Sequence, residues 1–202
     1  MSRILMSDAK RFSINYTINP WMVNQIGQVE SGRAHRQWET FKNTLETLTH
    51  IEIIPSHENL PDLVFTANAA TVKGNKCVLS HFKNIERQGE EPIFYNWFEK
   101  NNFQITTMPD SVFFEGAGDA LFSINEEMLW MGHGFRSDSQ SADILETELD
   151  TPVTTLKLIN PHFYHLDTCF CPLDLGHVMY YPAAFDNQAN KKIETYYPTH
   201  LR

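Results

Sequence analysis

The chain has 202 residues, 42 % of them hydrophobic and 20 % charged, which is enough for one sizeable core. Its 16 basic and 25 acidic residues give a net charge of -9, which argues against nucleic acid as a partner, because phosphates are bound by clustered Lys and Arg. Three cysteines, no signal-peptide pattern and no apolar run near the ~18 residues of a membrane helix predict a reduced, cytoplasmic protein that does not bind membranes.

Four segments carry apolar residues at the spacing of one helix face. These faces are marked by Trp38, Phe41, Leu45 and Leu48; by Phe94, Trp97 and Phe98; by Leu145 and Leu149; and by Phe185, Ala189, Ile193 and Tyr197. Ser137 or Asp138 would cap the third helix at its N-terminus. Each of the first three helices is followed by a strand-like run, at residues 51–55, 103–108 and 153–159.

Three further segments, residues 65–82, 114–135 and 163–185, each predict a β-hairpin that leads into a helix. Their turns read KGN, NEE and DLG, which is sound hairpin chemistry. The unit of strand, strand, helix and strand recurs about every 50 residues. We therefore predict an α/β fold, an α+β repeat, in a single domain that spans residues 1–202.

Polar residues recur with the same period. Asn68, Asp119 and Asp167 are separated by 51 and 48 residues. Asn19 lies 49 residues before Asn68, and Arg87 and Arg136 are also 49 apart. Equivalent positions of a rotational repeat face one axis, so these side chains are predicted to converge on one pocket. The alternative is that they are ordinary polar residues at hairpin ends.

The stretch HFYHLDTCFCPL holds the densest set of reactive side chains. As an extended strand, residues 163–171 would turn His165, Asp167 and the two cysteines to one face and Tyr164 to the other. A zinc site is disfavoured, because Cys-x-Cys with a His four residues earlier is not a usual tetrahedral spacing. A local dyad of His165 and Cys169 is disfavoured too, because a strand would hold them roughly 13 Å apart.

The cysteines are therefore predicted to be small buried residues, Cys77 among them. His165 can exchange protons near neutral pH, and Asp167 can hold a cation. The segment FEGAGDAL adds Glu115 and Asp119, and three carboxylates around one His suit a planar guanidinium with its many N–H donors. Arg87 and Arg136 would suit a carboxylate at the far end of such a ligand. The alternative is a set of solvated surface ion pairs.

Six segments in order resemble the guanidino-group-modifying (pentein) superfamily, and nearest its arginine dihydrolases: INPWM (18–22), PDLVFTANA (61–69), ERQGEEP (86–92), FEGAGDAL (114–121), GFRSD (134–138) and FYHLDTCFCPL (163–173). The resemblance implies a five-repeat β/α propeller of ββαβ units, of which about four are visible here. It also implies a C–N hydrolase that acts on linear amidines such as arginine and needs no metal or organic cofactor.

The resemblance also implies a role for each matching residue. Glu115 grips and helps to protonate the guanidinium, and His165 is the general acid and base. Asp167 holds the guanidinium nitrogens, while Asp119 binds substrate or orients a neighbour. Arg87 and Arg136 bind the substrate carboxylate, and Asn19 lines the pocket. Asn68 stands where deiminases and dimethylarginine hydrolases usually carry an acid, which favours a dihydrolase.

The family reaction starts with a Cys thiolate that attacks the guanidinium carbon. The family's nucleophile lies in its last repeat, whereas this chain stops at YYPTHLR (196–202), and none of its cysteines stands in that context. We therefore expect a chain truncated at its C-terminus that does not turn over arginine. Dimethylarginine hydrolysis, amidino transfer, a non-catalytic guanidine-binding protein and a structural protein remain alternatives, and a homo-oligomer is compatible with the sequence.

Overall fold

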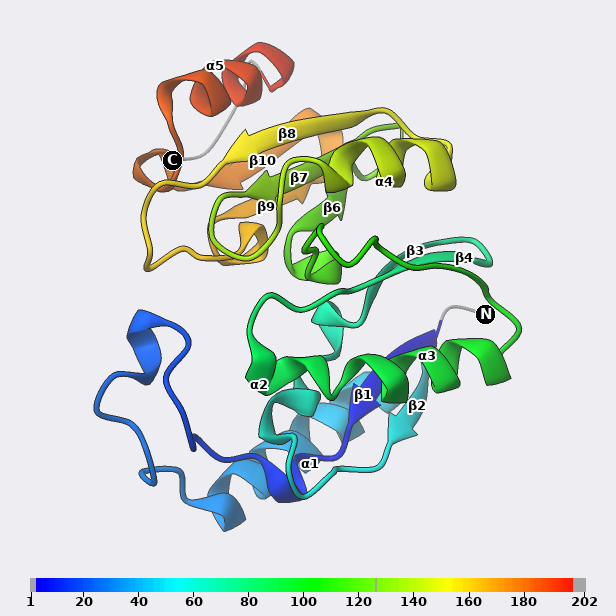
Figure 1. Cartoon of the computed structure of the whole chain (residues 1–202), viewed down its shortest axis with the longest axis vertical. Coiled ribbons are helices and arrows are strands. Elements are labelled where there is room, and N and C mark those ends of the chain that lie inside the picture. The colour runs from blue at the N-terminus through cyan, green and yellow to red at the C-terminus, as the bar shows by residue number, and fades with distance from the viewer. Residues whose placement is uncertain (1–2, 126, 198–202) are drawn as a thin grey trace. The chain divides into compact units, whose positions relative to one another are not determined.

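Figure 1 shows the computed structural model, which describes residues 3–125 and 127–197. Within these residues the chain divides into two compact units, one of residues 3–66 and 84–90 and the other of residues 67–83 and 91–197. A single domain spanning residues 1–202 therefore stays a prediction. None of the helices in the described stretches is long and apolar enough to cross a membrane.

The first unit is built on two parallel strands, in which Leu5 lies opposite Glu52. Its elements are β1 (Arg3–Ser7), η1 (Ala9–Arg11), η2 (Pro20–Met22), α1 (Ser31–Glu46), β2 (His50–Ile54), η3 (Pro61–Val64) and α2 (Ile85–Gln88). Strand β2 confirms the strand predicted at 51–55, one residue earlier. The main elements of this part of the chain are thus a strand, a helix and a second strand parallel to the first.

Helix α1 forms where apolar spacing predicts it, but its apolar face is not buried. No residue of α1 is buried. Phe41 keeps 59 % of its surface exposed, and Leu48 lies beyond the end of the helix with 78 % exposed. Apolar periodicity therefore gives the helix correctly without telling what the face packs against.

The second unit holds two three-stranded sheets of the same construction. In each, a hairpin of antiparallel strands is followed by a helix and then by a strand parallel to the second hairpin strand. The first comprises β3 (Ala70–Lys73), β4 (Lys76–Leu79), α3 (Glu91–Lys100) and β5 (Gln104–Thr106). The second comprises β6 (Ala120–Phe122), β7 (Leu129–His133), α4 (Ser141–Leu149) and β8 (Val153–Lys157). The predicted strand–strand–helix–strand unit is present in both.

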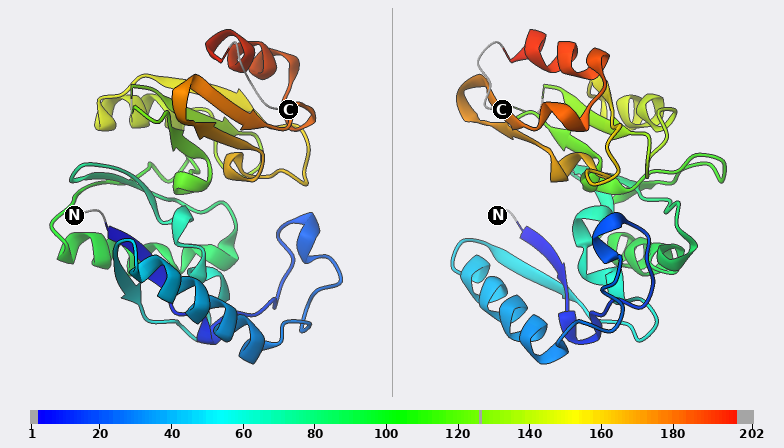
Figure 2. Two further views of the ribbon diagram at one scale, coloured as in Figure 1. Left: turned by 180° about the vertical axis from the view of Figure 1, so that it is seen from behind. Right: turned by 90° about the vertical axis from the view of Figure 1, so that its left-hand side faces the viewer.

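A third hairpin follows, formed by β9 (Phe170–Leu173) and β10 (His177–Tyr180) with the 3₁₀ turn η7 (Asp174–Gly176) between them. After the turn η8 (Pro182–Ala184) comes α5 (Asn187–Tyr196), which packs against β8 (Figure 2). Asp186 caps α5, because its carboxylate accepts the Ala189 N–H. Most of the terminal stretch 196–202 lies outside the described residues.

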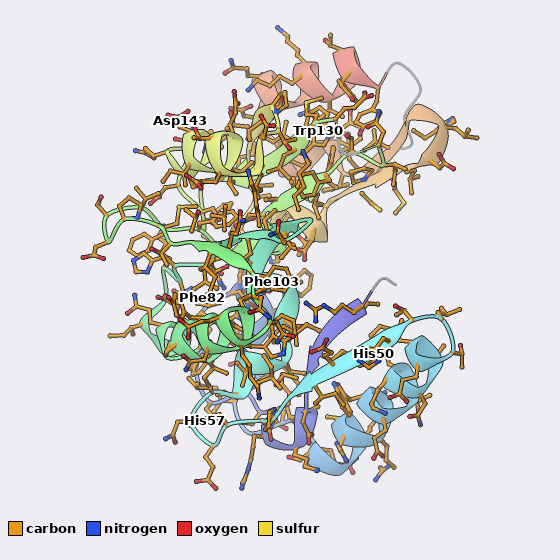
Figure 3. The ribbon with its side chains drawn as sticks, turned by 90° about the vertical axis from the view of Figure 1, so that its right-hand side faces the viewer. His50, His57, Phe82, Phe103, Trp130 and Asp143 are labelled. Carbon is orange, nitrogen blue, oxygen red and sulfur yellow. The ribbon has the colours of Figure 1, made fainter. Side chains whose placement is uncertain are left out.

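Two clusters of buried side chains hold the second unit together. In one, Leu129 and Met131 of β7 pack with Leu145 and Leu149 of α4. In the other, Trp130 of β7 packs with residues of α5, and its indole N–H donates to the Tyr197 hydroxyl at 3.2 Å. Figure 3 shows Trp130 directed into this part, whereas Asp143 stands on the outer face of α4. Strand β7 therefore supplies both clusters, one from each of its faces.

The sequence reading of residues 163–171 as one extended strand is wrong. Residues Leu166–Thr168 form a 3₁₀ turn, η6, before β9 begins at Phe170. The turn forms because the Thr168 hydroxyl donates to the His165 carbonyl at 2.6 Å and the Cys169 N–H donates to the Leu166 carbonyl at 3.1 Å. Local hydrogen bonds of this kind compete with strand pairing, and a Thr can supply them. Similar turns, η4 (Thr66–Asn68) and η5 (Gly116–Gly118), precede β3 and β6.

Candidate active site

The 3₁₀ turns η5 and η6 position the two central side chains of the candidate site. Glu115 is the residue immediately before η5, and His165 is the residue immediately before η6. Both lie in the second unit and both are buried, Glu115 completely. A tight turn before each hairpin therefore takes the place that a continuous strand was predicted to fill.

Glu115 is surrounded by donors. Its Oε2 accepts from Arg136 Nη1 at 2.9 Å and lies 3.3 Å from His165 Nε2. Its Oε1 accepts the Lys83 N–H at 3.4 Å. The Glu115 N–H itself donates to the Ser137 hydroxyl at 3.0 Å, which fixes the backbone beside the carboxylate. Buried carboxylates persist only when they are paired and hydrogen-bonded in this way.

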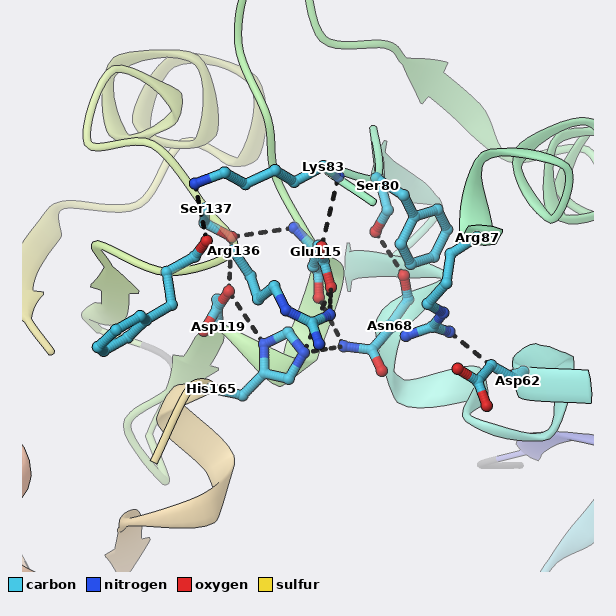
Figure 4. A network of polar contacts seen from close by, with 12 residues as sticks. Asp62, Asn68, Ser80, Lys83, Arg87, Glu115, Asp119, Arg136, Ser137 and His165 are labelled. Atoms are coloured by element: carbon cyan, nitrogen blue, oxygen red, sulfur yellow. Dashed lines mark hydrogen bonds and ion pairs between the residues drawn. The ribbon is translucent and has the colours of Figure 1, made fainter. Parts of the chain in front are cut away.

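His165 lies between two carboxylates, as Figure 4 shows. Its Nδ1 is 3.1 Å from Asp119 Oδ2, and its Nε2 faces Glu115. Burial lowers the pKa of His165, but Asp119 and Glu115 outweigh this effect and raise it to about 9, above the ordinary value of 6.5. His165 is therefore protonated at neutral pH, which makes it an acid rather than a base in this state.

Asp119 contacts His165 with a carboxylate that is itself hydrogen-bonded on both oxygens. It follows η5, and its Oδ1 accepts the Leu166 N–H at 3.0 Å while its Oδ2 accepts the Ser137 hydroxyl at 2.6 Å. Because these donors fix both oxygens, the carboxylate also fixes the imidazole that it contacts. The role that the resemblance implied for Asp119, binding substrate or orienting a neighbour, stays a prediction.

Asn68 presents its amide to the same pair. Its Nδ2 donates to the Glu115 carbonyl at 3.0 Å and lies 3.5 Å from His165 Nε2. The approach depends on Gly118, because a Cβ built at that position would collide with Asn68 Nδ2. Ser80 also donates to the Asn68 carbonyl. Gly118 therefore permits a close approach of an amide that can both donate and accept.

Arg136 lies on the Glu115 carboxylate and over the Tyr164 ring. Its Cζ is 4.8 Å from the centre of that ring, and the Tyr164 and His165 rings are 5.0 Å apart. Tyr164 was predicted to face away from His165, and this is wrong, because residues 161–165 are turn and bend structure and not an extended strand with alternating side chains. The role of Arg136 in binding a substrate carboxylate stays a prediction.

Asp167, in η6, is exposed, unlike the other carboxylates of this unit's cluster. Partial loss of hydration raises the pKa of its carboxyl to about 6; the His165 charge works against this shift, and Asp119 adds to it. Its carboxylate is thus near solvent and weakly held as an anion. A cation that approached it would favour ionisation.

The other two predicted site residues, Arg87 and Asn19, belong to the first unit. Arg87 is buried and binds Glu90 in a bidentate pair, with Nε 2.9 Å from Oε1 and Nη2 2.7 Å from Oε2 (Figure 4 draws Arg87). Asn19 caps η2, where its Oδ1 accepts the N–H groups of Trp21 and Met22. Their predicted roles at a ligand stay predictions.

Sequence reasoning missed two contributors to this cluster. Ser137 was expected to cap a helix, but Gln140 precedes α4 and the Ser137 hydroxyl joins Glu115 to Asp119 instead. Tyr164 was assigned to the strand face opposite His165. Their positions in the sequence could have indicated both residues. Ser137 directly follows the candidate residue Arg136, and Tyr164 directly precedes His165.

The three thiols differ from one another. Cys77 and Cys169 are buried as predicted, and burial raises the pKa of their thiols to about 11 and about 12. Cys171 is exposed, so its predicted burial is wrong, because the turn η6 shifts the alternation of the strand that follows. No group of His, Cys, Asp or Glu side chains in the described part of the chain is arranged to hold a metal ion.

Known proteins share both the sequence and the fold. The chain is 46 % identical over 200 residues to the bifunctional arginine dihydrolase/ornithine cyclodeaminase ArgZ of Synechocystis sp., which covers 99 % of this chain and 28 % of ArgZ. It is 34 % identical to the N(G),N(G)-dimethylarginine dimethylaminohydrolase of Mycobacterium tuberculosis, and this match covers 97 % of this chain and 64 % of that protein. The chain thus spans little more than a quarter of the bifunctional relative.

Solved structures agree with these relatives. The N-terminal domain of ArgZ, a cysteine-to-serine variant bound to substrate, matches with a TM-score of 0.95 at 46 % identity over 97 % of this chain and 72 % of that one. A dimethylarginine dimethylaminohydrolase adduct, 17 % identical with a TM-score of 0.71, shares the fold and covers 88 % of this chain and 68 % of that one.

The mixed α/β fold and these relatives define a protein of the guanidino-group-modifying pentein superfamily. Within it, the chain belongs to the family described as N,N dimethylarginine dimethylhydrolase, eukaryotic, whose model matches residues 5–194.

Proposed function

We propose that this chain is the guanidine-binding part of a C–N hydrolase that acts on the guanidinium carbon of arginine or a related guanidine. The observation that carries the proposal is His165 held between the buried carboxylates of Glu115 and Asp119, beside the Asn68 amide. The arginine dihydrolases among the relatives support arginine as the guanidine.

The chemistry of the cluster fits the family reaction. When a thiolate attacks the guanidinium carbon, the C–N bond breaks and the departing nitrogen needs a proton. His165 carries one at neutral pH and can give it up, which leaves the imidazole to activate the water that hydrolyses the thioether. The Asn68 amide offers an acceptor to a guanidinium and a donor to the carbonyl of a ureido product, which suits two successive hydrolyses.

Binding measurements by calorimetry test whether L-arginine is the ligand. We expect calorimetry to detect L-arginine, and we expect Asp167→Asn to weaken its binding, because it removes a carboxylate predicted to hold the guanidinium. His50→Gln, at an exposed position of β2, is the control and should bind as the wild type does. Equal affinity for L-arginine in both of these variants would contradict the assignment of the site.

Three alternatives to arginine hydrolysis predict different results. The family model and the mycobacterial relative favour dimethylarginine as the second candidate. Tighter binding of dimethylarginine than of L-arginine would select that candidate. Amidino transfer to an amine instead predicts an ornithine-like product only when an acceptor amine is present. A structural protein would bind neither guanidine.

The two buried thiols of this chain favour binding without turnover. A thiolate is the attacking form, and the raised pKa values of Cys77 and Cys169 keep both protonated at neutral pH. An ammonia-release assay on the chain tests this, and we expect no turnover of L-arginine. Activity that disappears in Cys77→Ser or Cys169→Ser would contradict the expectation and locate a nucleophile within the chain.

The finer architecture is also a proposal. We infer a pentein-type propeller of ββαβ units in a single domain over residues 1–202, with four of five units visible. The two complete ββαβ units support it. We further propose a cytoplasmic protein without nucleic-acid or membrane partners, and light scattering on a size-exclusion column would show whether it forms a homo-oligomer.

A further inference from the structure

The guanidinium of Arg136 already occupies the carboxylate that a guanidine ligand would use. Arg136 Nη1 donates to Glu115 Oε2 at 2.9 Å, and the same oxygen faces His165 Nε2. Glu115 has no exposed surface and Arg136 keeps only 5 % of its own. A second guanidinium therefore has no route to Glu115 Oε2 while Arg136 holds it.

The charges of the cluster lead to the same conclusion. Glu115 and Asp119 supply two negative charges, and Arg136 with protonated His165 supplies two positive ones. These four buried groups are thus balanced without a ligand, and the remaining carboxylate, Asp167, is exposed to solvent. A guanidinium that entered would add a positive charge in a medium of low dielectric constant, which is unfavourable unless a positive group leaves.

When Arg136 leaves Glu115, its guanidinium can stay in contact with the Tyr164 ring. Its guanidinium lies over the Tyr164 ring, and aromatic faces hold a guanidinium by cation–π contact while leaving its N–H donors available. What Arg136 would then need is a new anion. A free α-carboxylate on the ligand is such an anion, and Arg–carboxylate pairs form bidentate hydrogen bonds.

We propose that Arg136 is a specificity-determining residue, which holds Glu115 as an internal guanidinium and releases it only to a guanidine that brings its own carboxylate. The proposal rests on the proposed function, because it takes the Glu115 cluster as the guanidine site. It explains how one arginine rejects simple guanidines without contacting their guanidinium group. The exchange conserves charge, since one guanidinium–carboxylate pair becomes two.

The first test compares two probes on two variants. Wild-type chain is titrated by calorimetry with L-arginine and with methylguanidine, which lacks a carboxylate. Arg136→Gln frees Glu115, so its affinity for methylguanidine should rise about tenfold or more, the change that 1.4 kcal/mol produces. Its affinity for L-arginine should not rise in the same proportion, because the carboxylate has lost its partner.

Two further variants serve as controls. Arg136→Lys keeps a positive charge that can pair with Glu115, so methylguanidine should stay weak. Arg36→Gln removes an exposed arginine of α1 whose nearest carboxylate oxygen, on Glu30, is 3.6 Å away, and it should leave both probes unchanged. If Arg136 served only to anchor the ligand carboxylate, Arg136→Gln would weaken L-arginine and leave methylguanidine as weak as before. That outcome overturns the proposal and leaves the proposed function standing.

The second test needs no variant, and it therefore holds even if Arg136→Gln does not fold. Acetate supplies a carboxylate that is not joined to the guanidine. On the wild-type chain, acetate should strengthen methylguanidine binding, because it would pair with Arg136 and release Glu115. Chloride at equal ionic strength should not do so. Equal affinity in both salts contradicts the exchange. Failure of L-arginine to bind, together with a gain of methylguanidine in Arg136→Gln, would instead refute the proposed substrate alone.

Discussion

At the scale of single residues, His165 decides how the cluster responds to pH. A group whose pKa is higher in the folded than in the unfolded chain stabilises the fold when it is protonated. His165 rises from its ordinary value of 6.5 to about 9 because two carboxylates face its ring. The cluster is therefore a source of stability at neutral pH that alkali removes.

We expect the free energy of unfolding to be greatest, as far as His165 contributes, below pH 6.5 and to fall as the pH rises from there through about 9. The loss should be roughly 3 kcal/mol, since one pKa unit corresponds to about 1.4 kcal/mol. Urea denaturation at a series of pH values between 6 and 9.5 measures it.

His165→Gln separates this contribution from those of other groups. The variant should be less stable than wild type at neutral pH, and the difference between the two should shrink toward pH 9.5, because wild type then also loses its imidazolium. The exposed His50→Gln variant is the control and should follow the wild-type curve. A difference between wild type and His165→Gln that is constant with pH would show that the ion pairs do not stabilise the fold.

At the scale of elements, the 3₁₀ turn η6 packs closely against strand β7 because β7 has a glycine at the contact. Gly132 lies in β7, and a Cβ built there would meet the Leu166 Cβ at 2.8 Å. Two backbone-anchored atoms cannot approach so closely, so the strand and the turn would have to separate. Because His165 directly precedes η6, the position of the imidazole depends on this contact.

We expect Gly132→Ala to destabilise the fold by ~1–3 kcal/mol, the usual cost of overpacking. Thermal unfolding measures the stability, and L-arginine binding should weaken along with it because η6 moves. Gly32→Ala is the matched control, since a Cβ at this exposed position of α1 comes no nearer than 3.4 Å to any atom, that one belonging to a flexible arginine. The control should be neutral or slightly stabilising. A fully stable Gly132→Ala chain would contradict the packing.

The elements themselves were largely predictable, and the turns between them were not. Hairpins, helices and parallel strands follow from apolar periodicity and turn residues, and the structure has them within a few residues of where they are expected. The candidate residues Glu115 and Asp119 could be listed because both stand in the segment FEGAGDAL, at the start of a predicted hairpin. The turn η6 could not, because the Thr168 hydroxyl bond that closes it competes with strand pairing on equal local terms. Missing this turn misplaced Cys171, which follows it, and missing the turn and bend at residues 161–165 misplaced Tyr164.

At the scale of the whole molecule, helices with similar apolar spacing are buried to different extents. Phe94 of α3 is completely buried in the second unit, whereas Phe41 of α1 is 59 % exposed in the first. Apolar spacing along the chain does not distinguish them. The hydrophobic contribution to stability therefore comes more from the second unit's helices than from α1.

Phe94→Ala should cost ~3–5 kcal/mol, because it leaves a cavity in a packed core. Phe41→Ala should change stability by no more than ~0.5 kcal/mol, as surface substitutions do. Urea denaturation of both variants measures the contrast, and each serves as the other's control. Equal losses from both would mean that α1 is covered in solution.

The unequal burial of the three thiols has a practical consequence. Cys77 and Cys169 are buried with raised pKa values, while Cys171 is exposed on β9, six residues after His165. A maleimide dye at neutral pH should therefore attach once to the native chain, and mass spectrometry of the intact protein should show a single adduct that Cys171→Ser abolishes. The unmodified chain thus already contains an attachment point for a fluorophore on the hairpin that follows the imidazole, and this fluorophore would report ligand binding without any engineered cysteine.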